Sequence, residues 1–200
     1  MRRSILLLIS ISSLTITFSQ SWTQAQLDSA NTAKDIRDIT SVERETIMYI
    51  NLARLYPQLF AKIEVEKYFG TERYGDYLKD SPYRKSLMNE LKKAKPTTAL
   101  VFNKSMYDYA KCFAKELGEN GKVTHDRKNC AKGTFAECCS YGMDTGKDIA
   151  MQWLIDDKVT SVGHRINCLN PLYTKIGIGV IPILFGMIAP LQIYHGNTNS

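Results

Sequence analysis

The most informative stretch of the sequence reads GHRINCLNPLYTKIGIG and spans residues 163–179. Its first half favours a helix that ends at Leu169. Asn170-Pro171 follows, and proline cannot continue a helix. Its second half opens an uncharged run over residues 176–194 that glycine and proline interrupt repeatedly. Nineteen residues could nearly cross a membrane, but these interruptions favour two buried strands around a turn. We therefore expect the chain to close with a helix and then a hairpin.

Upstream of this segment the pattern is mainly helical. Thr40-Ser41-Val42-Glu43 has the hydroxyl and carboxylate of a capping box, which predicts the start of a helix. Pro57 predicts a break in that helix or a fresh first turn. Ser81-Pro82 predicts the start of another helical stretch.

The middle of the chain alternates between helix and strand. Residues 103–118 are the clearest amphipathic helix, with Gly118 as its expected stop. Residues 135–141 are short enough for a strand, and residues 148–156 are again helical. Helices, a strand, further helices and a final hairpin together predict an α+β domain.

The first nineteen residues resemble a secretory signal. The sequence MRRSILLLISISSLTITFS pairs two arginines with a mostly apolar run and ends in small or polar residues. We expect residues 1–19 to be removed, residues 20–42 to form a leader that packs loosely or stays mobile, residues 43–195 to form the domain, and residues 196–200 to be a tail. The expected location is therefore extracellular or periplasmic.

The composition is that of one globular domain. The chain has 200 residues, of which 44% are hydrophobic and 23% charged, and this profile disfavours a disordered or fibrous protein. The net charge of +6 includes two arginines of the signal, and the remaining basic residues are scattered among acids. Because no basic and aromatic pattern is interleaved, we expect no nucleic-acid partner.

Five cysteines in an exported chain are candidates for disulfides, and an odd count leaves at least one unpaired. Adjacent Cys138 and Cys139 rarely bond to each other, so each has its own partner or one is free. The pairing stays open, with one or two bridges plus a buried thiol favoured over a reactive cysteine. The five are Cys112, Cys130, Cys138, Cys139 and Cys168.

Two histidines and two acidic residues are candidates for a shared polar site. Imidazoles and carboxylates brought together hold a divalent cation or move protons, but sequence spacing alone does not bring them together. Taken singly, such a residue is more often a cap or a satisfied polar residue. The four are His125, Glu137, Asp156 and His164. Asp157 is a rival to Asp156, and His195 in the polar tail receives no role.

The order and spacing of several short motifs resemble the CAP superfamily, which comprises cysteine-rich secretory proteins, antigen 5 and pathogenesis-related 1 proteins. The bacterial secreted branch is the nearer match, and the resemblance covers about residues 43 to 195. The motifs are Asn51-x-x-Arg54, His125, Ala136-Glu137-Cys138-Cys139, Trp153-Leu154-Ile155-Asp156, Gly163 to Pro171 and Ile176-Gly177-Ile178-Gly179.

The resemblance implies an α-β-α sandwich with a small central antiparallel sheet and a cleft above it. It maps the family's cleft tetrad onto His125, Glu137, Asp156 and His164. Some family members bind divalent metals, and we expect His125 and His164 to hold such an ion, with zinc favoured and with the acids orienting the imidazoles or completing the coordination. Two residues depart from the family pattern. Asp156 is one methylene shorter than the usual glutamate, and Cys138 replaces the asparagine that usually follows the tetrad glutamate.

The favoured function is a secreted binding domain for a lipid, a peptide or an extracellular partner protein. The alternative is a metal-dependent hydrolase or peptidase in which Glu137 is the general base, with Ser161 and Cys139 as available nucleophiles. No His-Glu-x-x-His motif occurs. A third interpretation is an interaction module in which the tetrad is a buried relic.

Other residues near the expected cleft have ordinary structural interpretations beside functional ones. Met143, Met151 and Leu154 would suit a lipid at the rim, but on a helix such residues belong more often to the core. Arg165 could bind an acidic ligand group, and a surface ion pair is the expected use.

Overall fold

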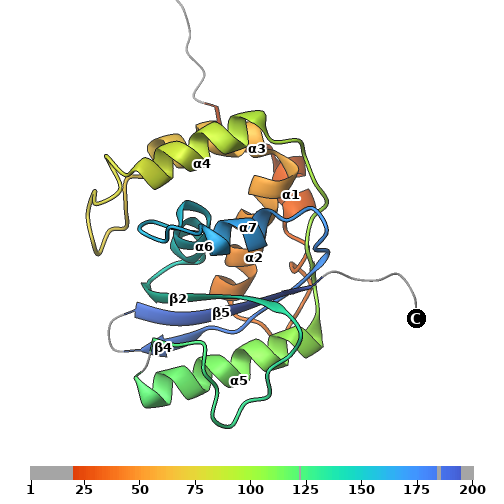
Figure 1. Ribbon diagram of the computed structural model, residues 1–200. Coiled ribbons are helices and arrows are strands. Elements are labelled where there is room, and N and C mark those ends of the chain that lie inside the picture. Colours follow the sequence, from red (N-terminus) through yellow and green to blue (C-terminus); the bar gives the residue numbers. More distant parts are fainter. Residues whose placement is uncertain (1–19, 122, 184–185, 195–200) are drawn as a thin grey trace, which may run out of the picture.

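The computed structural model describes residues 20–121, 123–183 and 186–194. A sheet lies between two layers of helices, with α5 (Lys104–Asn120) on one side and the other labelled helices on the opposite side (Figure 1). The predicted α+β class and α-β-α sandwich are therefore confirmed. The predicted signal peptide, the tail and His195 lie outside the described residues.

The N-terminal residues pack more tightly than the sequence suggested. Helix α1 (Gln24–Ala30) contacts α2 (Ser41–Leu55), and Ala30 and Ala33 are completely buried. Their small side chains let the chain lie close to α2, so residues 24–39 are not a loosely packed leader. Thr40 and Glu43 form the predicted capping box at the start of α2.

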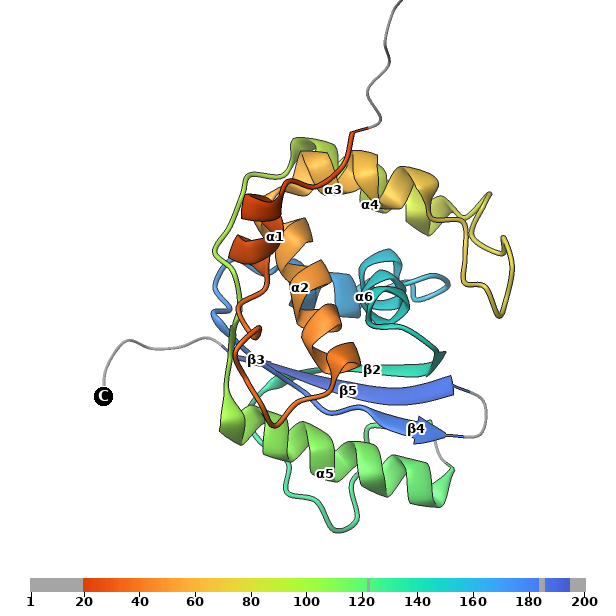
Figure 2. The same cartoon turned by 180° about the vertical axis from the view of Figure 1, so that it is seen from behind.

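Proline and serine start the next helices as expected. Pro57 opens α3 (Pro57–Ile63), which a short 3-10 turn, η1 (Val65–Lys67), follows. The Ser81 hydroxyl accepts two backbone N–H groups at the start of α4 (Pro82–Lys93). The chain then runs down the side of the molecule to α5 (Figure 2).

Helix α5 is longer than predicted. It ends at Gly121, which adopts the left-handed conformation with φ 60° and ψ 28°, and Gly118 lies inside the helix. Two glycines of the IGIG motif pack against this helix. A Cβ on Gly177 would lie 2.2 Å from the Tyr107 nitrogen, and one on Gly179 would lie 2.4 Å from the Lys111 nitrogen. These glycines therefore let the sheet approach the α5 backbone.

The sheet has five strands in the described residues, with the order β1-β3-β5-β2 and with β4 also paired to β5. The pairs that involve β5 are antiparallel, but β1 and β3 are parallel, so the sheet is not purely antiparallel. The parallel pair arises because a long crossover through α5, β2, α6 and α7 separates β1 from β3. The strands are β1 (Val101–Phe102), β2 (Ala136–Met143), β3 (Lys175–Ile178), β4 (Ile181–Ile183) and β5 (Gly186–Tyr194).

The uncharged run near the C-terminus forms strands, as predicted, but there are three of them instead of two, since β3 and β4 both pair with β5. In the part of the chain that the structure describes, no helix has the length and apolar character needed to cross a membrane.

Two buried arginines connect the helices above the sheet, α6 (Gly146–Ile155) and α7 (Gly163–Leu169), to their neighbours. Arg54 donates to four carbonyls, including those of Cys168 and Asn170 at the end of α7. Arg165 donates to the Leu154 carbonyl and to others on α4 and α6. Arg165 also forms the predicted ion pair, with Glu90 at 3.2 Å, but its own side chain is only 2% exposed. The pair therefore reaches the surface only through Glu90, and the guanidinium mainly binds the ends of helices.

Candidate functional site

His164 and Asp156 form one close pair at the junction of α6 and α7. The Asp156 carboxylate lies 2.7 Å from His164 Nδ1 and accepts the His164 backbone N–H at 2.9 Å. Its side chain is 1% exposed, whereas that of His164 is 24% exposed. The rival acid, Asp157, instead accepts the Ser81 hydroxyl. Asp156 is therefore the acid that orients this imidazole.

The turn that carries this pair has an unusual backbone. Asp156, Lys158 and Val162 all have positive φ angles, of 56°, 63° and 45°. Such conformations cost energy for residues other than glycine, and most of all for a β-branched residue such as valine. The two hydrogen bonds to Asp156 stabilise this turn and fix the position of His164 at the start of α7.

His125 and Glu137 form the second pair, with 2.9 Å between His125 Nδ1 and a Glu137 oxygen. This pair includes a third residue that the sequence analysis missed. Arg127 contacts both Glu137 oxygens, and its side chain is 5% exposed and lies 3.9 Å from the centre of the Phe113 ring. The only sequence signal was a basic residue two positions after His125, which places both side chains on one side of an extended chain.

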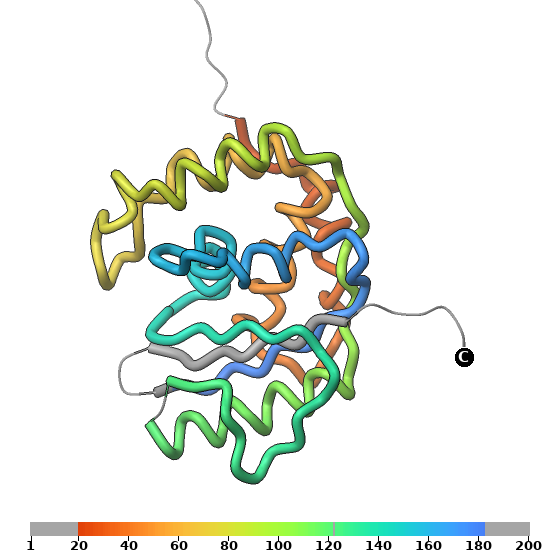
Figure 3. The backbone as a smooth tube through the Cα atoms, in the orientation of Figure 1, coloured from red at the N-terminus to blue at the C-terminus, as the bar shows by residue number. Residues whose placement is uncertain are grey.

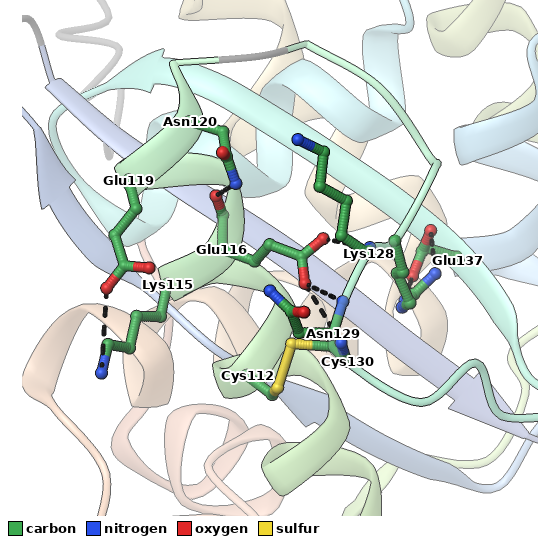
Figure 4. Close-up of a disulfide and its surroundings, with 10 residues drawn as sticks. Cys112, Lys115, Glu116, Glu119, Asn120, Lys128, Asn129, Cys130 and Glu137 are labelled. Carbon is green, nitrogen blue, oxygen red and sulfur yellow. Dashed lines mark hydrogen bonds and ion pairs between the residues drawn. A yellow bond between two sulfur atoms is a disulfide. The ribbon is translucent and has the colours of Figure 1, made fainter.

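A long loop carries His125 and Arg127 from the end of α5 to β2 (Figure 3). The disulfide Cys112–Cys130 and Glu116 hold this loop against α5 (Figure 4). The Glu116 carboxylate accepts the backbone N–H groups of residues 128, 129 and 130. These hydrogen bonds lower the pKa of Glu116 below its ordinary value.

Cys139 adjoins the second pair. Its sulfur lies 3.8 Å from His125 Nδ1, and the thiol is 8% exposed. Burial, with a smaller contribution from the Glu137 charge, raises the pKa of Cys139 to about 12. The thiol is therefore protonated at neutral pH and is a poor nucleophile in this state.

The four predicted tetrad residues form two separate pairs around the edge strand β2. Cys138 packs into the cluster that contains Trp153 and Cys168, whereas Cys139 packs with Phe113 and Leu117 of α5. Because neighbouring strand residues point to opposite faces, Glu137 shares the face of Cys139. Among the described residues, the ligand atoms of His125, Glu137 and Cys139 lie within 4.8 Å of one another. The same group does not include His164.

A cleft of about 330 Å³ lies beside β2 and contains the His164–Asp156 pair, and its lining includes Cys139, which contacts the other pair. His164, Asp156 and Cys139 line it together with aromatic and aliphatic side chains, among them Tyr77, Tyr141, Trp153, Ile155 and Val159. A second hollow of about 440 Å³ shares Tyr77, Tyr141 and Gln152 with the cleft.

The expected apolar rim is only partly found in the structure. Met143 lines the second hollow, whereas Met151 and Leu154 are completely buried in the core. The aromatic residues Tyr74 and Tyr77, which are about half exposed, form the open side of the hollow instead. The core interpretation therefore holds for the two residues on α6.

Comparison with known proteins places this chain in a family. A family model described as the cysteine-rich secretory protein family, CAP, matches residues 85–182. A search of curated proteins finds no match. Among solved structures, a crystal structure of a hookworm platelet inhibitor is similar, with 10% sequence identity and a TM-score of 0.44. The similarity covers 82% of this chain and 75% of that chain.

The matched stretch contains both histidine–carboxylate pairs and the whole of α5, β2, α6, α7 and β3. The narrower similarity to bacterial secreted members stays a prediction. The matched residues 85–182 include all four tetrad residues, so the chain contains a domain of the cysteine-rich secretory protein (CAP) family.

Proposed function

We propose that this protein is an exported binding domain and that the cleft beside β2 holds a peptide-sized ligand. The observation that carries this proposal is the lining of the cleft, which combines the oriented His164–Asp156 pair with aromatic and aliphatic walls. Binding sites for small molecules have this mixture of an apolar surface and a few polar groups. A volume of about 330 Å³ is at the lower end of the range for such sites.

Two buried polar atoms beside the cleft support a ligand that forms hydrogen bonds. Trp153 Nε1 and Gln152 Oε1 have no hydrogen-bond partner among the described residues, and both residues line the cleft. An unsatisfied buried polar group costs about 1–3 kcal/mol. A peptide, which carries N–H donors, carbonyl acceptors and apolar side chains, matches these groups better than a lipid chain does.

Export is supported by two independent features. Residues 1–19 have the charge and apolar pattern of a signal peptide. The Cys112–Cys130 disulfide is typical of proteins that reside in an oxidising compartment. A partner outside the cytoplasm is therefore the expected source of the ligand.

Tryptophan fluorescence tests ligand binding directly, because the chain has two tryptophans and Trp153 lines the cleft. The Trp22→Phe variant leaves Trp153 as the single reporter. We expect pools of short peptides to change its emission and phosphatidylcholine vesicles to leave it unchanged. In the Trp22→Phe background, the further substitution His164→Ala should weaken peptide binding about tenfold. The substitution His125→Ala should leave binding unchanged, because His125 does not line the cleft. A response to vesicles alone, or to neither probe, would refute the peptide ligand.

A second candidate function is binding of a zinc-like metal ion, which the group of His125, Glu137 and Cys139 favours. Nitrogen, carboxylate and thiolate ligands suit zinc, and a bound zinc ion deprotonates a coordinating thiol. Arg127 competes for Glu137, so His125 and Cys139 are the most available ligands. The expected pair of His125 and His164 has less support, because His164 does not belong to the group of described residues whose ligand atoms lie within 4.8 Å of one another.

Calorimetric titration with zinc separates the two ligand sets. If the metal binds beside Cys139, Cys139→Ser should weaken binding at least tenfold and His164→Ala should have little effect. The reverse pattern would restore the histidine pair as the metal site. Unchanged zinc binding after His125→Ala would exclude both sets.

The geometry favours binding over hydrolysis. Glu137, the expected general base, is paired with the buried Arg127, and the Cys139 thiol is protonated at neutral pH. Turnover of peptide or ester substrates that Glu137→Gln abolishes, without loss of folding, would instead support a hydrolase.

A further inference from the structure

Two thiols with no role in the proposed cleft lie buried together between β2 and α7. Cys138 is in the middle of β2, and Cys168 is in the last turn of α7. Both residues are completely buried, and neither is part of the disulfide described above. The contacts of the two thiols show whether they can form a redox pair.

The contacts of Cys138 lead directly to Cys168. Its sulfur donates to the His164 carbonyl at 3.8 Å and accepts from Asn167 Nδ2 at 3.6 Å. Residues 164 and 168 are one helical turn apart and lie on the same face of α7. Burial raises the pKa of the Cys138 thiol, and a hydrogen bond with the Cys168 thiol raises it further. Cys168 directly follows Asn167 in α7 and belongs to the same buried cluster as Cys138, so the two thiols lie close together.

The third free thiol is not a competing partner. Cys139 points to the opposite face of β2, where it packs with Phe113 and Leu117. A bond between adjacent Cys138 and Cys139 would also strain the peptide unit between them. Among the free cysteines, Cys138 and Cys168 are therefore the two that share one buried cluster.

We propose that Cys138 and Cys168 form a second disulfide, which fastens α7 to the edge strand β2 in an oxidising compartment. The oxidant is another disulfide, either that of a small molecule such as oxidised glutathione or that of a protein. One thiolate attacks that disulfide and releases a thiol, and the second thiolate displaces the other half as a thiol. The two cysteines lose two protons and two electrons, and the oxidising disulfide gains them as it becomes two thiols.

This bond would connect the two halves of the candidate site. Strand β2 carries Glu137 and Cys139, and α7 begins with the turn that holds His164. A covalent link between them restricts how far His164 moves from the edge of β2, and it leaves Cys139 as the only free thiol of the five. The odd cysteine count then has a structural explanation, since four cysteines pair and one faces the cleft.

Thiol counting on the full chain tests the bond without any knowledge of the ligand. The protein is refolded in a mixture of reduced and oxidised glutathione, because buried thiols exchange slowly once folded. It is then unfolded, alkylated and analysed by mass spectrometry. We expect one alkylated cysteine, Cys139, and a cross-linked peptide that joins Cys138 to Cys168. Three alkylated cysteines, or a cross-link that contains Cys139, would overturn the proposal.

Thermal unfolding provides the second measurement. The bond closes a loop of about thirty residues, so its formation should raise the melting temperature by about 5 °C or more. Cys168→Ser should remove this gain, and the matched variant Cys139→Ser should retain it. If Cys168→Ser and Cys139→Ser respond identically to reduction, the second disulfide does not exist.

Discussion

The two histidine–carboxylate pairs contain the same kinds of residue but are supported in different ways. The His164–Asp156 pair lies between two helices, and its acid is bound by a backbone N–H as well as by the imidazole. The His125–Glu137 pair connects a loop to a strand, and its acid is bound by Arg127. The His125 side chain is 56% exposed, more than twice the 24% of His164.

This difference shows that sequence similarity of a tetrad does not make its members equivalent. Asp156 is dedicated to the position of His164, so that pair remains available to a ligand in the cleft. Glu137 is neutralised by a buried cation, so its charge contributes mainly to the stability of the loop.

Removal of Glu137 should have the largest effect on stability. Glu137→Ala leaves the Arg127 guanidinium buried without its carboxylate, which should lower the free energy of unfolding by about 3 kcal/mol. Urea denaturation measures this loss. In the double variant Glu137→Ala with Arg127→Met no unpaired charge remains, so most of the stability should return. A single variant that costs less than about 1 kcal/mol would show that Arg127 reaches solvent when Glu137 is absent.

Removal of Asp156 should have a smaller effect of a different kind. Asp156→Ala loses the acceptor for two groups of His164, which should cost about 2 kcal/mol in the same measurement. Asp156→Asn should cost less, because asparagine tolerates the left-handed conformation and retains an acceptor oxygen. The matched control, Asp157→Ala, loses only the Ser81 hydrogen bond. Equal losses at positions 156 and 157 would contradict the orienting role of Asp156.

The smallest expected effect is a pH dependence confined to the loop of the His125 pair. The backbone hydrogen bonds hold the pKa of Glu116 below its ordinary value of 4.5. Because the folded pKa is the lower one, this stabilisation is complete above pH 4.5 and is lost as the pH falls below it. Glu116→Gln should remove that part of the acid sensitivity. Hydrogen exchange at residues 128–130 between about pH 7 and pH 3 should show the change, and identical profiles would refute it.

Local rules in the sequence predicted much of the fold. The Thr40–Glu43 capping box, the break at Pro57 and the strands after residue 175 all depend on neighbouring residues, and the structure contains each of them. The end of α5 was misplaced because Gly118 and Gly121 are both suitable stops by their identity. The burial of Ala30 and Ala33 depends on α2, which the local sequence does not reveal.

The candidate site was only partly accessible to sequence reasoning. Motif order named His125, Glu137, Asp156 and His164, but it did not show that they form two pairs around the edge of β2. Arg127 carried no motif, and its importance comes from burial against Phe113 and from contact with Glu137. The pairing of Cys112 with Cys130 likewise depends on how the loop returns to α5.

Sequence alone was sufficient to predict the family resemblance, most of the helices and strands, and the residue types available to the site. These properties follow from patterns over a few residues, such as caps, prolines and apolar periodicity. The tertiary structure alone decided which acid orients which histidine, which thiols are neighbours, and that a buried arginine neutralises Glu137. Each of these depends on residues brought together from distant positions, where burial and distance, rather than sequence spacing, set the strength of the interaction.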